Sequence, residues 1–506
     1  MPVLRVAVDI HRCRLLGLTG SAALAAGGAA AGALPVRDVP APHSAAAGLG
    51  LAAAYFGLVM LSAAWALLGR TLRGPVPPSP RGLLLTLALW AAPLLLTPPL
   101  FSRDVYSYLA QGAMAEAGID VYTHGPSRLG GPTAAEVAPV WRHTPTPYGP
   151  VFLRSAAVMA GWARADVATG VLGLRLVALL GVALMALCLP ALARRCGADP
   201  RTAVWLGGLN PLVLLHLVGG AHNDAVMLGL LGAGLVAALG GRPAAGAVLV
   251  TLAALVKAPA ALGLPAVVLL RARRRSGRLP LLRAVLATGG AAAATTVAAT
   301  AVAGTGYGWT TALDTPVSPG NWSLTSTLGR LTGAGLRRLG SGLAEFAVPA
   351  WHLAGLAATA LAVLVVWRRH HRHRPVYAVG LSLGAVAVLG PAIRPWYVLW
   401  GVFLIAAAAP RGSARPVRAA ALLSGLLALV VMPSGFPPDH NQLLIAVGGS
   451  TLGVLALWCA YRVAARAADR APRPEALPPA APRPMDPPPQ SDRPTGDPRR
   501  PLGSTA

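Results

Sequence analysis

Charged residues are scarce in this chain, and acidic residues are the scarcest. Only 12% of the 506 residues are Asp, Glu, Lys or Arg, whereas 55% are hydrophobic. A water-soluble domain of this length needs a charged surface, so the class of soluble globular proteins is excluded. The apolar residues instead form many runs that could cross about 30 Å of hydrocarbon. The sequence therefore predicts an all-α polytopic membrane protein.

Cysteine and nucleotide-binding motifs are also missing or rare. The four cysteines show no CxxC spacing and fall within predicted helices or near their ends, so neither a disulfide framework nor a metal site is indicated. There is no Walker loop, no GxGxxG after a strand and no DxD-like pair. An enzyme of this kind must use an activated substrate that is already in the membrane.

Apolar runs bounded by charge, Gly or Pro predict about fourteen membrane segments. They cover residues 15–34, 46–68, 82–98, 171–193, 203–217, 225–240, 244–256, 258–270, 281–303, 346–367, 376–390, 396–408, 417–432 and 443–461. The formal charge of +26 comes from arginines in the links between these runs, which is the positive-inside pattern. The same distribution argues against a nucleic-acid partner. If every segment crosses a plasma membrane, the arginine-rich links and both termini lie in the cytoplasm.

The run 244–270 could be one tilted helix or two short ones that meet at Lys257. We favour two helices, because Pro259 breaks the run. Two helices also keep Arg242 and the arginines of 271–275 on one side of the membrane. This arrangement places Lys257 at the outer surface.

The predicted organisation is a membrane domain, residues 1–465, followed by a disordered Pro/Arg-rich cytoplasmic tail, residues 466–506. Two outer loops, 99–170 and 304–345, are large enough to hold structure. The second loop carries Trp322, an aromatic residue suited to the headgroup level or to stacking on a sugar.

The first outer loop is predicted to contain interfacial helices. Val105, Tyr108, Leu109 and Gly112 share one helical face, which fits a helix lying along the membrane surface. A second interfacial element is predicted to begin at Tyr148.

Polar residues collect at the outer ends of the predicted helices. They are Asp104, His222, Asn223, Asp224, Lys257, Arg394, Asp439 and His440. An ionisable side chain at such a place indicates a functional site by default. A lipid phosphate ester as substrate needs cations for the leaving phosphate and one carboxylate to accept a proton from the attacking hydroxyl. Lys257 and Arg394 are the candidate cations, and Asp104 is the candidate carboxylate.

Each of these residues also has a structural interpretation. Asp104 could pair with Arg103 or cap the following helix. The 222–224 triplet could cap the sixth segment, although three polar residues exceed what one cap needs. Lys257 could extend to the lipid headgroups. A polar turn between helices explains the 439–441 motif adequately.

Six motifs occur in a fixed order along the chain: SRDVYSYLAQG at 102–112, GIDVYTHGP at 118–126, PTPYGPV at 145–151, GAHNDA at 220–225, KAP at 257–259 and RPWY at 394–397. Together they resemble the actinobacterial polyprenol-phosphomannose-dependent alpha-1,6-mannosyltransferases that extend lipomannan backbones. The likeness covers residues 83–461.

The resemblance implies a GT-C glycosyltransferase fold with the catalytic Asp in the first outer loop. It implies an inverting, metal-independent transfer of mannose from polyprenyl-phosphate-mannose to a lipid-anchored mannan, without any cofactor. Asp104 matches the base. Lys257 and Arg394 match positions expected near the donor phosphate, and Tyr148 and the 222–224 triplet match other motif positions. The full set of predicted substrate-binding residues is Arg103, Tyr106, Tyr108, Gln111, Tyr148, His222, Asn223, Asp224, Lys257, Trp322, Arg394, Trp396 and Tyr397.

Three rival interpretations stay open at this point. The transferred sugar could be another lipid-linked sugar such as arabinose, or the acceptor could be a different one. The chain could be a transporter or lipid flippase, for which charges in the middle of the helices and repeated halves are expected. Here the polar motifs lie at helix ends and no repeat is visible. A silent scaffold is disfavoured by Asp104 together with two cations.

Overall fold

The computed structural model describes residues 9–35, 44–274, 276–314, 321–371, 373–410, 412, 414–429 and 439–470. Every regular element among these residues is helical, which confirms the predicted all-α class. The α-helices are α1 (Ile10–Ala31), α2 (Ala45–Thr71), α3 (Pro80–Ala91), α4 (Asp104–Glu116), α5 (Gly131–Ala135), α6 (Pro139–Arg142), α7 (Pro150–Ala163), α8 (Val167–Cys196), α9 (Pro200–Gly207), α10 (Asp224–Leu239), α11 (Pro243–Ala254), α12 (Leu264–Ala272), α13 (Pro280–Ala303), α14 (Leu324–Arg338), α15 (Ala347–His370), α16 (Pro375–Leu389), α17 (Val398–Ala408), α18 (Ala414–Leu429) and α19 (His440–Arg470). Shorter helical turns are η2 (Ala92–Leu95), η3 (Pro126–Arg128), η4 (Val213–Gly219), η5 (Ala258–Gly263), η6 (Gly308–Asp314), η7 (Gly342–Phe346) and η8 (Pro395–Tyr397).

The helices begin where the sequence supplies capping groups. The hydroxyls of Ser44 and Ser79 accept backbone N–H groups at the starts of α2 and α3, and the Asp166 carboxylate does so for α8. Proline occupies the first helical position of α7 and α11, where its missing N–H costs no hydrogen bond. Local sequence therefore sets these boundaries.

Small residues allow the first two helices to pack closely. A Cβ atom on Gly20 of α1 would lie 2.6 Å from the Leu61 nitrogen of α2, and one on Gly57 would lie 2.5 Å from the Gly20 oxygen. Such backbone approach is typical of helix pairs in membranes, where burial of apolar surface gives no driving force.

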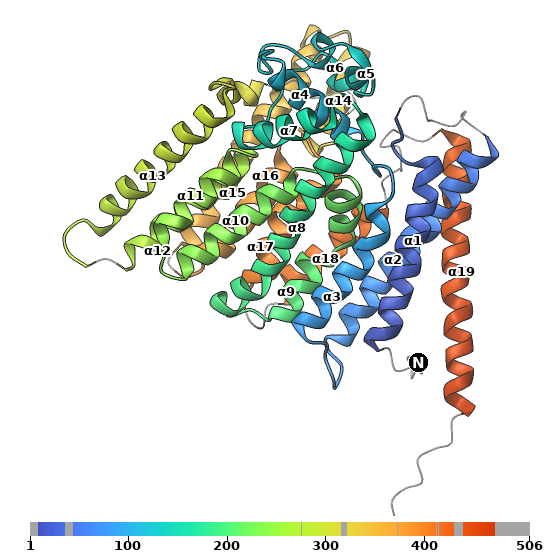
Figure 1. Ribbon diagram of the computed structural model, residues 1–506. Coiled ribbons are helices and arrows are strands. Elements are labelled where there is room, and N and C mark those ends of the chain that lie inside the picture. Colours follow the sequence, from blue (N-terminus) through green and yellow to red (C-terminus); the bar gives the residue numbers. More distant parts are fainter. Residues whose placement is uncertain are drawn as a thin grey trace, which may run out of the picture.

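The long helices run side by side, and the short ones gather at one end of the bundle (Figure 1). Helices α4, α5, α6, α7 and α14 lie at this end, which we call the site end. The links α2–α3, α8–α9 and α12–α13 lie at the opposite end, which we call the arginine end. Helix α19 flanks the bundle on one side and packs against α2.

Each of the fourteen predicted segments overlaps at least one helix, but the number of crossings is not confirmed. Five described helices are long and apolar enough to span a membrane, or six if η4 and α10 form one bent span. Helices such as α11, α16 and α17 have 10–17 residues. A twelve-residue helix is only about 18 Å long, so it does not cross the hydrocarbon by itself.

The predicted break near Lys257 is confirmed. Helix α11 ends at Ala254, Lys257 adopts an extended backbone, and η5 begins at Ala258. Helix α11 also contacts η5 and α12, so the chain turns back at Lys257 instead of continuing as one straight helix.

Helices α4 and α7 form where interfacial helices were predicted, but the face of α4 that the sequence assigned to the membrane surface is packed inside the protein. Val105, Tyr108, Leu109 and Gly112 of α4 are all buried. Helix α4 packs against α7, and a Cβ on Gly112 would lie 2.4 Å from the backbone of Ala156. The shared apolar face therefore belongs to a protein core.

Asp439 precedes α19, and His440 and Asn441 are its first residues, while the rest of the predicted polar turn lies outside the described residues. The Asp439 carboxylate accepts the Gln442 N–H, and the Gln442 side chain accepts the Asp439 N–H. This reciprocal pair caps α19. The predicted tail lies outside the described residues from 471 on, and α19 continues to Arg470.

The two ends of the bundle predict a labelling pattern. In a chain whose exposed Cys459 is replaced by Ser, Ala135→Cys at the site end should react with a membrane-impermeant thiol reagent in intact cells. Ser276→Cys at the arginine end should react only after permeabilisation, because the arginine-rich links are expected inside. Both positions are exposed. Labelling of Ser276→Cys in intact cells would overturn the orientation.

Candidate active site

Asp104 begins α4 at a sharp turn of the chain. Phe101, three residues earlier, has a φ of 64°, in the left-handed region that non-glycine residues rarely adopt. The Ser102 hydroxyl then accepts the Asp104 N–H at 3.1 Å. The carboxylate stands in the first turn of the helix, where the helix dipole favours negative charge.

The side chain of Asp104 does not cap α4 and does not pair with Arg103. The N-cap position belongs to Arg103. The Arg103 guanidinium pairs with Glu136 at 3.4 Å and donates to the Leu34 oxygen at 2.6 Å. The carboxylate of Asp104 is therefore left for other contacts, and 13% of its side chain remains exposed.

Those contacts come from a tryptophan and a histidine. Trp141 Nε1 donates to Asp104 Oδ1 at 2.9 Å, and His222 Nδ1 lies 4.0 Å from Asp104 Oδ2. The same His222 nitrogen lies 3.1 Å from the Tyr108 hydroxyl. The base predicted from the sequence thus lies against the predicted 222–224 motif.

His222 lies where the chain bends between η4 and α10. The axes of these two elements differ by 107°, and Ala221 between them has a φ of 53°. The His222 ring stacks on Trp396 with a centroid distance of 3.8 Å. Asn223 occupies the N-cap of α10, but its side chain does not cap the helix.

Asp224 and Lys257 form a buried ion pair. Lys257 Nζ lies 3.0 Å from both carboxylate oxygens of Asp224, and Trp400 Nε1 donates to Asp224 Oδ1 at 2.6 Å. The ammonium also lies 4.5 Å from the centre of the Tyr397 ring. The Asp224 side chain is fully buried and that of Lys257 is 12% exposed. Lys257 therefore does not extend to the headgroups, and Asp224 balances its charge.

Arg394 lies over the ring of Trp141, whose edge N–H donates to Asp104. Its guanidinium carbon is 5.8 Å from the centre of the Trp141 ring. The turn before Arg394 is held by residues of the 304–345 segment, where Asn321 Oδ1 accepts the Ile393 N–H and the Ser323 hydroxyl donates to the Pro391 oxygen. Among the described residues, no ion pair is formed by Arg394.

Tyr148 lies between Tyr108, on the Asp104 side of the centre, and Lys257 of the buried ion pair. Its ring meets Tyr108 edge to face at 5.3 Å, and Lys257 Nζ lies 5.8 Å from its centre. Burial raises the pKa of the Tyr148 phenol well above its ordinary value, and the Lys257 charge opposes this only in part. The phenol therefore stays protonated and can act as a hydrogen-bond donor.

The structure brings together most of the residues predicted for the site. These are Asp104, Tyr108, Tyr148, His222, Asn223, Asp224, Lys257, Arg394, Trp396 and Tyr397. Three others make structural contacts instead. Arg103 binds Glu136, Tyr106 donates to the Ala33 oxygen at 2.7 Å, and Gln111 accepts the Thr146 hydroxyl at 3.0 Å. 

Trp322 is the outlier of the predicted set. Its side chain is 44% exposed, beside Asn321 and Ser323, which hold the turn before Arg394. Trp322 is next to these two residues in the sequence. Among the described residues, however, its side chain makes no observed contact with Asp104 or with the buried ion pair.

The prediction from the sequence did not include four residues of the centre. Trp141 and Trp400 carry no periodicity or motif that marks them. Arg175 donates to the carbonyls of Leu95, Thr97 and Gly219, and His216 lies 4.8 Å from Trp396, ring to ring. Both are ionisable residues inside predicted segments, a signal that could have found them.

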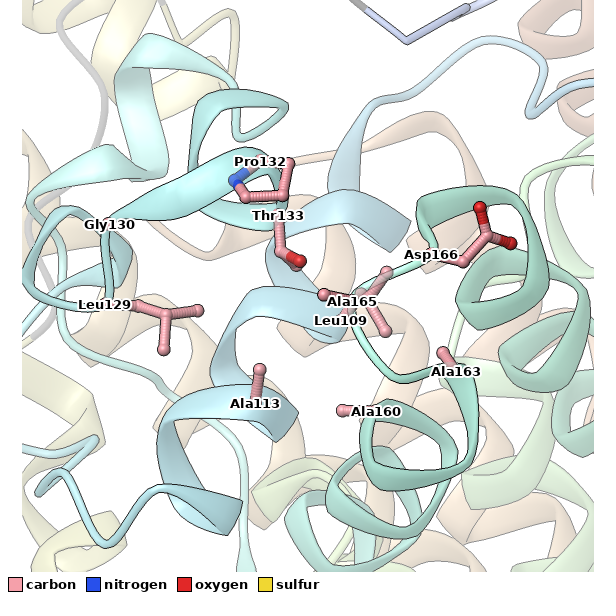
Figure 2. Close-up of a pocket in the computed structure, with 10 residues that line it drawn as sticks. All are labelled: Leu109, Ala113, Leu129, Gly130, Pro132, Thr133, Ala160, Ala163, Ala165 and Asp166. Atoms are coloured by element: carbon pink, nitrogen blue, oxygen red, sulfur yellow. The ribbon is translucent and has the colours of Figure 1, made fainter.

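A separate cavity of about 190 Å³ lies on the other face of α4 (Figure 2). It is lined mainly by small and apolar residues of α4, α5 and α7, such as Ala113, Pro132 and Ala160. Its one carboxylate, Asp166, accepts the Thr169 N–H as the cap of α8. This cavity therefore contains no group suited to the predicted chemistry.

The comparisons with known proteins identify the family of this chain. Residues 14–273 match the family model described as alpha-(1->6)-mannopyranosyltransferase, N-terminal domain, and residues 325–461 match the MptB C-terminal domain. The chain belongs to this family. It is therefore a glycosyltransferase, and the family resemblance predicted from the six motifs is confirmed.

The alignments with the following curated relatives cover most of this chain and most of each relative. A probable alpha-(1->6)-mannopyranosyltransferase of Mycolicibacterium smegmatis is 34% identical over 93% of this chain and 92% of its own length. Alpha-(1->6)-mannopyranosyltransferase A of Mycobacterium tuberculosis is 37% identical over 84% of each chain. Alpha-(1->6)-mannopyranosyltransferase B of Corynebacterium glutamicum is 33% identical over 79% of this chain and 73% of its own length.

No group of three or more His, Cys, Asp or Glu side chains in the described part of the chain is arranged to hold a metal ion. The expectation of a metal-independent reaction stays a prediction.

The buried ion pair predicts a stability pattern. Lys257→Met should lower the free energy of unfolding by about 3–5 kcal/mol, because it leaves the Asp224 carboxylate buried without a cation. Asp224→Asn/Lys257→Met should recover much of this loss, since both charges are gone. Thermal unfolding in detergent measures both variants. Equal losses in the single and double variants would contradict a coupled pair.

Proposed function

We propose that this protein transfers mannose from polyprenyl-phosphate-mannose to a hydroxyl of a lipid-anchored mannan, a precursor of lipomannan or lipoarabinomannan, and forms an alpha-1,6 linkage. The observation that carries the proposal is the shared indole of Trp141, whose N–H donates to Asp104 and whose ring centre lies 5.8 Å from the Arg394 guanidinium. A carboxylate and a cation held by one rigid ring are what a displacement at a sugar phosphate needs. The names of the relatives supply the sugar and the linkage.

Asp104 is proposed as the general base. The acceptor hydroxyl attacks C1 of mannose while its proton passes to the Asp104 carboxylate, and the bond between C1 and the phosphate oxygen breaks. One in-line displacement converts a beta-linked donor into an alpha-linked product. The partial exposure of Asp104 supports this role, because a carboxylate must be reachable by the acceptor.

Arg394 is proposed to bind the phosphate as negative charge develops on the leaving oxygen. A guanidinium offers planar paired donors that match phosphate geometry. Its charge is not balanced by a carboxylate among the described residues, whereas that of Lys257 is balanced by Asp224. Lys257 is therefore proposed to shape the phosphate side of the site together with Asp224, more than to bind phosphate as a free cation.

The reaction is proposed to take place on the outer face of the plasma membrane, with both termini in the cytoplasm. The separation of the site end from the arginine end supports this orientation. The donor then stays in the membrane while its sugar reaches Asp104.

Asp104→Asn should lower transfer by about 10²- to 10⁴-fold, because the amide cannot accept a proton. The asparagine oxygen can still accept the Trp141 N–H, so membrane abundance should not change. The assay follows radiolabelled mannose from synthetic polyprenyl phosphate to a short alpha-1,6-mannoside in membranes, with linkage analysis of the product. Asp120→Asn is the matched control, since Asp120 is an exposed carboxylate in the same loop whose contact to the Tyr122 N–H asparagine can keep. Normal turnover by Asp104→Asn would remove the base assignment.

Arg394→Gln should lower turnover by about 10²-fold and weaken donor saturation, and Arg394→Lys should remain impaired because a point charge does not replace two parallel donors. Arg154→Gln, an exposed arginine on α7, is the control and should behave as the parent chain. The same transfer assay, run across donor concentrations, separates the two effects. Full activity of Arg394→Lys together with Arg394→Gln would exclude a phosphate contact.

A further inference from the structure

A basic cavity opens at the arginine end, far from the candidate active site. It has a volume of about 550 Å³ and is lined by Arg242, Arg271 and Arg274, together with the first residues of α11. None of the described residues that line it is acidic. A second cavity of about 160 Å³ lies between the C-terminal end of α10 and the start of α16. Arg195, Arg273 and Arg374 are among the residues that line it.

Two of the arginines of the larger cavity are held in place by the protein. Arg274 donates one Nη to the Leu239 oxygen at 3.0 Å, and Arg271 donates to the Thr288 hydroxyl at 3.4 Å. Gly241 supports this packing, because it has a φ of 91° and a Cβ there would lie 3.1 Å from Arg274 Nη1. Each guanidinium has five N–H donors, so these hydrogen bonds leave donors for a ligand.

Apolar surface adjoins the cavity on α13. Arg271 contacts Thr288 of α13, and the preceding two turns of that helix expose Leu281, Leu282, Val285 and Leu286 by 47% to 65%. An occupant with a phosphate at one end and hydrocarbon chains at the other matches both surfaces. A free anion would use only the arginines.

We propose that this cavity binds the phosphate of an anionic phospholipid, with its acyl chains along the start of α13. Basic pockets between membrane helices recognise such headgroups, and each arginine near the surface adds to the attraction. Arginine suits a phosphodiester because it can donate two parallel hydrogen bonds. The cavity lies at the end of the bundle opposite Asp104, so the proposed lipid site is separate from the candidate active site.

The test measures lipid binding by the full-length protein in detergent. Phosphatidylglycerol or phosphatidylcholine is titrated into the micelles, and both the midpoint of thermal unfolding and the retained lipid in native mass spectrometry are recorded. Phosphatidylglycerol should stabilise the parent chain more than phosphatidylcholine does. Arg242→Gln/Arg271→Gln should weaken the apparent affinity for phosphatidylglycerol by at least about tenfold. Arg274 is kept because it contacts the end of α10.

The control is Arg194→Gln/Arg201→Gln, which removes two exposed arginines at the same end that line neither cavity. It should bind phosphatidylglycerol as the parent chain does. An unchanged response to phosphatidylcholine shows that both variants are folded. Equal affinity in the test and control variants would overturn the proposal. Equal stabilisation by inorganic phosphate alone would overturn it too, because the site would then recognise a free anion.

Discussion

The ion pair between Asp224 and Lys257 is the contact on which the centre depends. It joins the start of α10 to the break between α11 and η5, and Trp400 of α17 donates to the same carboxylate. An uncompensated charge at this depth costs several kcal/mol, so the three elements are held together. Because Asp224 immediately follows His222 and Asn223, the pair also fixes where those side chains lie.

Aromatic rings connect this pair to the exposed edge of the site. Tyr397 lies against Lys257, Trp396 stacks on His222, and Trp141 lies between Asp104 and Arg394. Rigid rings hold the charged groups at fixed distances. Because the rings themselves carry no charge, they also keep the surroundings of these groups poor in water. Precise placement of this kind is what a one-step displacement requires.

Much of the fold was predictable because hydrophobic runs and helix-breaking residues act locally. The break at Lys257 followed from Pro259 and the surrounding arginines, and it was confirmed. The number of crossings was not predictable, since short helices such as α11 are covered by neighbours that the sequence does not identify. The site was predictable as a set of residues but not as a set of partners. Asp224 and Lys257 are 33 positions apart, and nothing in either motif indicates that one neutralises the other.

The interacting side chains of the centre come together because the helices are broken at these places. The chain leaves helical geometry before Asp104, before Asp224, at Lys257 and before Arg394, and each of these residues belongs to the centre. A continuous helix would hide its backbone and spread its side chains around its axis. A break at the end of a bundle turns several polar side chains toward one place and leaves backbone groups that other residues must satisfy, which membrane proteins tolerate only where protein or water surrounds them. His216, His222 and Asn223 retain buried polar atoms without a hydrogen-bond partner in the described structure. Such atoms are costly, and their concentration makes the η4–α10 break a place where the centre carries that cost.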